Sequence, residues 1–119
     1  MDETTAGSDA VKPVAGRVHF SFDDAEIASS IKAMCLSRNS GDDIYFVPLE
    51  DVHPGILEAS DTTRDDAGPG TAHFYTIKTL TANGVDEAWY YPYADGAYAP
   101  IRDMITFGGD RVSWRVSEV

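Results

Sequence analysis

Residues 17–22 read Arg17-Val18-His19-Phe20-Ser21-Phe22, so polar and apolar side chains alternate along this segment. Successive side chains of a β-strand point to opposite faces, and this period of two places the three apolar residues on one face. Asp23-Asp24 follows as a turn, and residues 26–29 can return as the second strand of a hairpin. The pattern therefore predicts a half-buried β-hairpin.

Further short strands are expected along the rest of the chain, because apolar or alternating segments recur between turn signals. These segments are residues 31–36, 44–47, 71–80, 85–91, 104–107 and 111–116. A short helical turn is expected at 49–53, where Pro48 precedes it and Pro54-Gly55 ends it. Many short strands and no long amphipathic helix predict a mainly β fold.

The connections between these strands are predicted from turn residues. Asn83-Gly84 is typical of a tight hairpin turn, and Gly108-Gly109-Asp110 predicts a hairpin connection. Residues 60–70 are polar and are interpreted as a long loop. Residues 1–15 lack periodicity and are interpreted as a flexible tail, which leaves residues 16–119 as one folded domain.

Composition excludes several classes of function. The chain has 119 residues, 43% of them hydrophobic, which suits one domain with its own core. Its formal net charge of -11 argues against contact with nucleic acid phosphates and against docking on anionic membranes. Cys35 is the only cysteine, so no internal disulfide forms. No signal segment or membrane-spanning stretch is apparent, and the protein is expected to be cytoplasmic.

Two clusters combine large aromatic residues with proline. They read Tyr45-Phe46-Val47-Pro48-Leu49-Glu50-Asp51-Val52 and Trp89-Tyr90-Tyr91-Pro92-Tyr93. Aromatic faces stack on planar rings and attract cations, so Tyr45, Trp89, Tyr91 and Tyr93 can wall a pocket for a flat or cationic ligand. Large aromatics equally build hydrophobic cores, and both interpretations stay open at this point.

The order of these motifs resembles the DUF427 family of small bacterial and fungal domains. Residues 45–52 are similar to its Tyr-Tyr-x-Pro-x-Glu-Asp-Val element, and residues 57–63 to its Leu-x-x-Ser-x-x-Thr segment. Residues 72–75 resemble its Ala-x-Tyr strand start, and residues 88–92 its Ala-Trp-x-Tyr-x-x-Pro segment, with the proline placed differently. The resemblance implies a small antiparallel two-sheet β-tent, an Mss4-like fold, in which some relatives hold ligands in aromatic cages.

The chain departs from the family pattern in one place. The family usually has Cys-Pro-x-Lys-Gly before the strand at 71, whereas this chain reads Arg64-Asp65-Asp66-Ala67-Gly68-Pro69-Gly70. Chemistry that needs the cysteine or the lysine is therefore not expected here. If a site exists, the segment 60–70 is expected to lie close to the aromatic clusters.

Nine residues are the candidate ligand-binding set, chosen as aromatic or polar side chains in or near these motifs. They are Tyr45, Asp51, Ser60, Asp61, Thr62, His73, Trp89, Tyr91 and Arg102. No metal or cofactor is predicted, because the three histidines lack ligand spacing and one cysteine cannot complete a zinc site.

The function favoured by the sequence is non-catalytic binding of a small ligand, with no nucleic acid or membrane partner. One alternative is an enzyme that acts on a small molecule or nucleotide and uses His73, Asp51 or Asp61 for acid–base chemistry. The other is a protein-interaction module that uses an exposed strand edge or aromatic patch. The sequence leaves the oligomeric state open.

Overall fold

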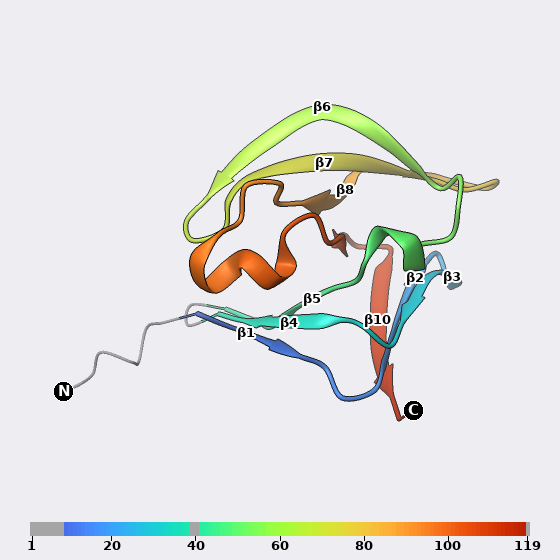
Figure 1. The fold of residues 1–119 in the computed structure, drawn as a ribbon. Coiled ribbons are helices and arrows are strands. Elements are labelled where there is room, and N and C mark those ends of the chain that lie inside the picture. The colour runs from blue at the N-terminus through green and yellow to red at the C-terminus, as the bar shows by residue number, and fades with distance from the viewer. Residues whose placement is uncertain (1–8, 39–40, 119) are drawn as a thin grey trace.

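The computed structural model describes residues 9–38 and 41–118, which form a mainly β domain (Figure 1). Its strands make three antiparallel sheets. The first sheet has the order β1 (Ala10–Pro13), β4 (Met34–Ser37) and β5 (Ile44–Phe46). The second has the order β10 (Val112–Ser117), β2 (Arg17–Phe22) and β3 (Ala25–Ser30). The third has the order β6 (Leu57–Asp66), β7 (Gly70–Lys78), β8 (Asn83–Tyr90) and β9 (Thr106–Phe107).

Within residues 9–38 and 41–118, two short 3-10 helices connect the strands. One is η2 (Leu49–Asp51), which confirms the helical turn expected near residue 49, and the other is η3 (Gly96–Ile101). Across residues 9–38 and 41–118, none of the helices has the length and hydropathy needed to cross a bilayer. The mainly β prediction is confirmed, although the strands divide into three sheets where two were expected.

The hairpin that opens the sequence argument is confirmed. β2 and β3 pair antiparallel, and Val18, Phe20 and Phe22 are at most 1% exposed. The turn residues Asp23 and Asp24 have φ values of 51° and 68°, the left-handed conformation that a tight two-residue hairpin turn requires.

The prediction of a long loop at residues 60–70 is wrong. β6 continues to Asp66, a turn occupies residues 67–69, and β7 begins at Gly70. Most of β6 is exposed, so no alternation of apolar residues marks it in the sequence. The pairing with β7 jumps between Ala59 and Thr63, which makes residues 60–62 an irregular bulge.

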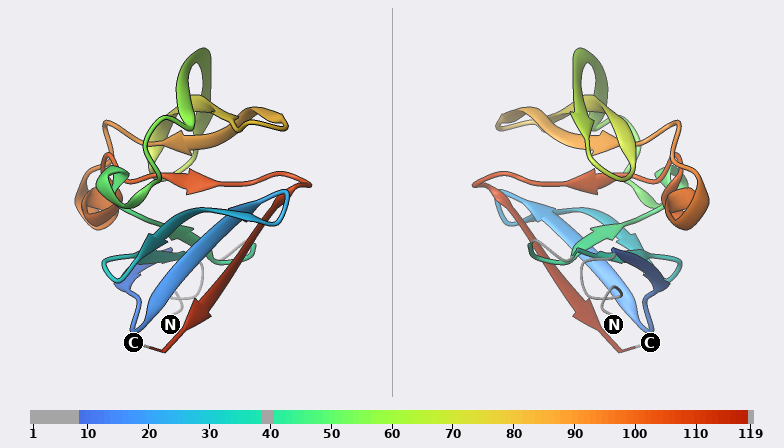
Figure 2. Two further views of the ribbon diagram at one scale, coloured as in Figure 1. Left: turned by 90° about the vertical axis from the view of Figure 1, so that its right-hand side faces the viewer. Right: turned by 90° about the vertical axis from the view of Figure 1, so that its left-hand side faces the viewer.

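Two expected turns are also corrected. Asn83 and Gly84 pair with β7 as the first residues of β8, and the turn lies before them at residues 79–82. There Thr79 closes the turn with its hydroxyl, which accepts a hydrogen bond from the Ala82 amide at 3.2 Å. β9 and β10 form no hairpin, because β9 pairs with β8 and β10 pairs with β2. Figure 2 shows the chain crossing from the third sheet to the second one between β9 and β10.

The folded region begins before the expected start at Gly16. β1 at Ala10–Pro13 pairs with β4, although its short sequence carries no alternating pattern. A strand at a sheet edge can be held by backbone hydrogen bonds to one neighbour, and these are independent of side-chain type. Residues 1–8 of the expected tail lie outside the described residues.

Among the described residues, the core consists of two hydrophobic clusters. One cluster centres on Phe20, Phe22 and Ile77, and the other on Phe46 and Ile101. Within the first cluster, the Val47 amide donates to the Ile105 carbonyl at 2.9 Å, and the Ile105 amide donates to the Val47 carbonyl at 2.8 Å. This pair joins the chain leaving β5 to the chain entering β9, and hence the first sheet to the third.

Gly16 provides a test of how closely β10 approaches the start of β2. It has a φ of +131°, and a Cβ there would lie 2.6 Å from the backbone oxygen of Ser117. Gly55 has a φ of +82° but has nothing within 4 Å of such a Cβ. We expect Gly55→Ala to lower the free energy of unfolding by about 1 kcal/mol through backbone strain alone. Gly16→Ala should cost about 1–3 kcal/mol more, because overpacking against backbone is added.

Urea denaturation of both variants measures the difference. Equal losses of stability in Gly16→Ala and Gly55→Ala would contradict the close approach of β10 to the start of β2.

Candidate functional site

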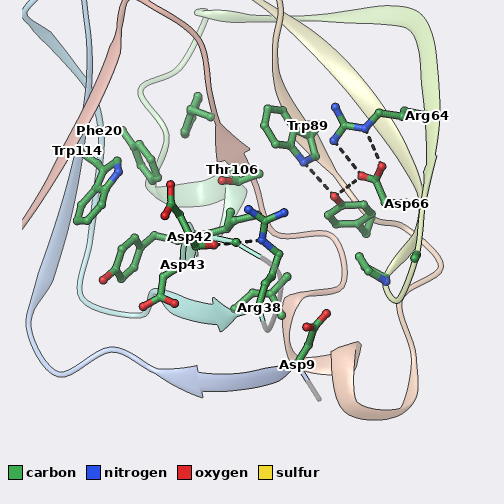
Figure 3. Close-up of a pocket in the computed structure, with 18 residues that line it drawn as sticks. Asp9, Phe20, Arg38, Asp42, Asp43, Arg64, Asp66, Trp89, Thr106 and Trp114 are labelled. Carbon is green, nitrogen blue, oxygen red and sulfur yellow. Dashed lines mark hydrogen bonds and ion pairs between the residues drawn. The ribbon is translucent and has the colours of Figure 1, made fainter. Parts of the chain in front are cut away.

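An open cleft of about 1060 Å³ is lined by residues from all three sheets. Its lining draws from both hydrophobic clusters, since Phe20 and Phe107 belong to one and Leu36 and Tyr91 to the other. Six aromatic residues line it: Phe20, Tyr45, Trp89, Tyr91, Phe107 and Trp114. Figure 3 shows this cleft with Thr106 lying between Phe20 and Trp114 on one side and Trp89 on the other.

The first side of the cleft is built from β2, β5 and β10. The rings of Tyr45 and Trp114 contact each other with centroids 4.5 Å apart. Phe20 is the cross-strand partner of Trp114 and contacts Phe107 at a centroid distance of 4.7 Å. Trp114 is 51% exposed, so its ring is available at the mouth of the cleft.

The second side is a hydrogen-bonded chain of four side chains from β6 and the end of β8 (Figure 3). Arg64 donates to Asp66 from Nε at 2.7 Å and from Nη2 at 2.9 Å. The Tyr91 hydroxyl donates to Asp66 Oδ2 at 2.6 Å and accepts a hydrogen bond from the Trp89 indole at 3.2 Å. The Arg64 guanidinium also lies 5.1 Å from the Trp89 ring centroid, which fixes the indole from a second direction.

This chain of contacts changes the proton affinity of its members. Burial is the largest influence on Tyr91 and, together with the hydrogen bond to Asp66, raises the pKa of its phenol to about 12. Burial by itself raises the pKa of Asp66, but hydrogen bonds from Arg64 and Tyr91 outweigh it and leave that pKa below its ordinary value. At neutral pH the second side therefore holds a neutral phenol, a carboxylate and a guanidinium in fixed positions.

Three of the nine candidate residues line the cleft, namely Tyr45, Trp89 and Tyr91. Arg64, Asp66, Ala67 and Pro69 line it as well, so the later half of the segment 60–70 does lie beside the aromatic clusters. That agrees with the expectation for this segment, which carries the chain's departure from the family pattern.

The other six candidate residues lie elsewhere. Asp51 in η2 accepts a hydrogen bond from Ser30 at 2.6 Å. Residues 60–62 form the exposed bulge of β6, where Thr62 donates to Asp86 at 2.6 Å. His73 lies on the opposite face of β7 from Phe74, against the rings of Tyr90 and Tyr93, and Arg102 follows η3. These residues do not converge on one place.

Several residues of the cleft were not singled out from the sequence. Trp114 is one, and its aromatic side chain in a strand was a usable signal. Thr106 is another, because it is the polar residue in the apolar run Met104-Ile105-Thr106-Phe107. Asp42 and Asp43 reach the cleft from the segment before β5, where paired acids are more often solvated turn residues.

A second polar arrangement crosses the sheet of β10, β2 and β3. The His19 ring lies 3.0 Å from Ser117 Oγ through Nε2 and 3.1 Å from Glu26 Oε2 through Nδ1. The order of groups resembles a serine–histidine–acid relay, but the cleft lining includes none of the three residues. We interpret it as a row of cross-strand contacts that stabilises this sheet.

Metal ligation has no cluster to support it in the part of the chain that the structure describes. Among residues 9–38 and 41–118, no three His, Cys, Asp or Glu side chains stand together in a way that could hold an ion.

Comparison with known proteins gives a family. The model of a family described as a domain of unknown function, DUF427, matches residues 10–118. No curated protein matches the chain. The matched range includes β1 and all the residues of the cleft except Asp9.

Tyr91 offers a direct test of the second side of the cleft. We expect its phenol to titrate near pH 12 in the folded protein, against an ordinary pKa of 10.0. In Asp66→Asn that pKa should fall but stay above the ordinary value, because burial remains. Since the folded state holds this proton more tightly, its stabilising contribution is complete below pH 10 and disappears as the pH rises through about 12.

Carbon NMR of labelled tyrosine Cζ measures the titration, and Tyr91→Phe identifies the resonance. An assigned Tyr91 signal that titrates with the exposed tyrosines would contradict the buried hydrogen bond to Asp66.

Proposed function

The chain belongs to the DUF427 family, a domain of unknown function, and from this premise and the geometry of the cleft we propose that it binds a small planar organic ligand without catalysis. The observation that carries the proposal is the meeting of Trp89 and Tyr91 with Tyr45 and Trp114 around one open volume. Tyr45, Trp89 and Trp114 come from three different strands and Tyr91 follows β8, so the convergence is a property of the fold.

The size and chemistry of the cleft support this function. Pockets for small molecules typically have volumes of about 300–1,000 Å³ and combine aromatic walls with a few fixed polar groups. The cleft, at about 1060 Å³, is slightly larger than the upper limit of that range. Trp89 is held by its hydrogen bond to Tyr91 and by the Arg64 guanidinium, so its ring is already ordered for stacking.

Catalysis receives less support from the positions of the acid–base candidates. His73 packs against Tyr90 and Tyr93, Asp51 is bonded to Ser30, and Asp61 lies in the exposed bulge of β6. General acid–base catalysis needs such groups within hydrogen-bond reach of one substrate. A binding function places no such requirement on them.

We also propose that the architecture is a variant of the Mss4-like β-tent. The third sheet would form one wall, and the first and second sheets together would form the other. The packing of Phe46 of β5 against Tyr91 after β8, with ring centroids 6.0 Å apart, supports a direct contact between these two walls. The ligand cleft would then lie on the inner side of the tent.

Intrinsic fluorescence can test ligand binding directly, because both tryptophans of the chain line the cleft. We expect planar aromatic and heteroaromatic compounds to change the emission in a saturable way and to shift backbone amide NMR signals around β5, β8 and β10. Trp114→Ala should weaken binding at least fivefold, about 1 kcal/mol, the usual loss for a stacking anchor. Its ring is half exposed, so the variant should remain folded.

Tyr93→Ala is the matched control, since Tyr93 is 70% exposed and does not line the cleft. It should bind like the wild-type protein. The proposal fails if no planar compound in a broad panel binds, or if Tyr93→Ala and Trp114→Ala behave alike.

A further inference from the structure

Thr106 has a buried hydroxyl that nothing else in the described structure uses. The residue is 1% exposed, and its Oγ1 has no hydrogen-bond partner among residues 9–38 and 41–118. A buried hydroxyl without a partner lowers stability by about 1–3 kcal/mol, so such groups are rare in folded proteins. A position of this kind therefore calls for a functional explanation.

The position of Thr106 gives that explanation. It lines the cleft and pairs across β9 and β8 with Trp89, which stands on the second side. Figure 3 shows Thr106 between Phe20 and Trp114 on one side and Trp89 on the other. Its neighbour Ile105 turns into the hydrophobic core, as strand alternation requires, so the direction of Thr106 is fixed by the fold.

The charges around the cleft favour a cation. Among the described residues, Asp9, Asp42, Asp43 and Asp66 line it together with Arg38 and Arg64. Asp66 already holds Arg64 through two hydrogen bonds, and Asp9 accepts a hydrogen bond from Tyr98, so the charge argument rests on the exposed carboxylates of Asp42 and Asp43 against the guanidinium of Arg38. Six aromatic rings add faces of negative potential. An anion would meet net repulsion here.

We propose that the ligand of this cleft is a planar organic cation whose N–H group donates a hydrogen bond to Thr106 Oγ1. This inference rests on the proposed ligand-binding function and specifies the class of ligand. The ring stacks between the two aromatic sides, the aspartates at the opening attract its charge, and Thr106 selects cations that carry a donor. Thr106 is thus the residue that determines specificity, while Trp89 and Trp114 supply most of the contact area.

Three small probes separate charge from hydrogen bonding at a slightly alkaline pH. Protonated 4-aminoquinoline is a planar cation with N–H donors, 1-methylquinolinium is a planar cation without one, and quinoline is planar and neutral. We expect the affinity to fall in that order. Thr106→Val should weaken binding of 4-aminoquinoline about fivefold, the value of one hydrogen bond. It should leave binding of 1-methylquinolinium unchanged. Thr106→Ser keeps the accepting hydroxyl, so it should bind 4-aminoquinoline like the wild-type protein.

A separate variant tests the attraction between the aspartates and the charge of the ligand. Asp42 and Asp43 are both exposed, so the double variant Asp42→Asn with Asp43→Asn should fold normally. It should weaken binding of both cations and leave quinoline unaffected, and added salt should reduce the difference.

The ligand-free protein supplies an independent readout. Thr106→Val replaces an unpaired buried hydroxyl by a methyl group of the same shape, so it should raise the thermal midpoint while it lowers affinity. A lower midpoint would mean that the hydroxyl already has a partner within the fold, and would overturn the assignment.

The outcomes distinguish the two proposals. If none of the probes and no other planar compound binds, the ligand-binding function itself fails. If compounds bind through Trp114 but quinoline binds as tightly as the cations, or Thr106→Val affects all probes equally, the function stands and this inference is wrong.

Discussion

The backbone pair between Val47 and Ile105 is the constraint on which the rest of the structure depends. Two hydrogen bonds of 2.9 and 2.8 Å join chain segments that leave β5 and approach β9, and both residues are almost completely buried. Backbone groups buried in an apolar core must be paired, so this link cannot be exchanged for contacts with water. It therefore fixes the first sheet relative to the third.

The cleft follows from that link through strand alternation. Val47 and Ile105 face one hydrophobic cluster, while Phe46 before the link contributes to the other cluster. Thr106, the next residue after Ile105, consequently points into the opening between the two sides. The same register that completes the core also leaves one polar group and several rings around a volume that the core does not fill.

The parts of the fold that could be predicted from sequence are those in which one face is buried. The β2–β3 hairpin was predictable because its apolar residues repeat with period two and its two aspartates suit the turn. β6 was not, because most of its residues are exposed and its polar sequence reads as a loop. The turn at residues 79–82 was missed because Asn83-Gly84 resembles a hairpin turn, although pairing with β7 makes it part of β8.

The residues of the cleft likewise fall into those that the sequence predicted and those that only the structure identified. The sequence by itself determined the family, the mainly β class and the aromatic residues Tyr45, Trp89 and Tyr91, because these depend on residue type and local order. Only the tertiary structure decided which polar groups stand beside them. Arg64, Asp66, Thr106 and Trp114 reach the cleft from strands far apart in the chain, whereas Asp51 and His73 face other surroundings. Pairing between distant strands sets those positions, and no local pattern encodes that pairing.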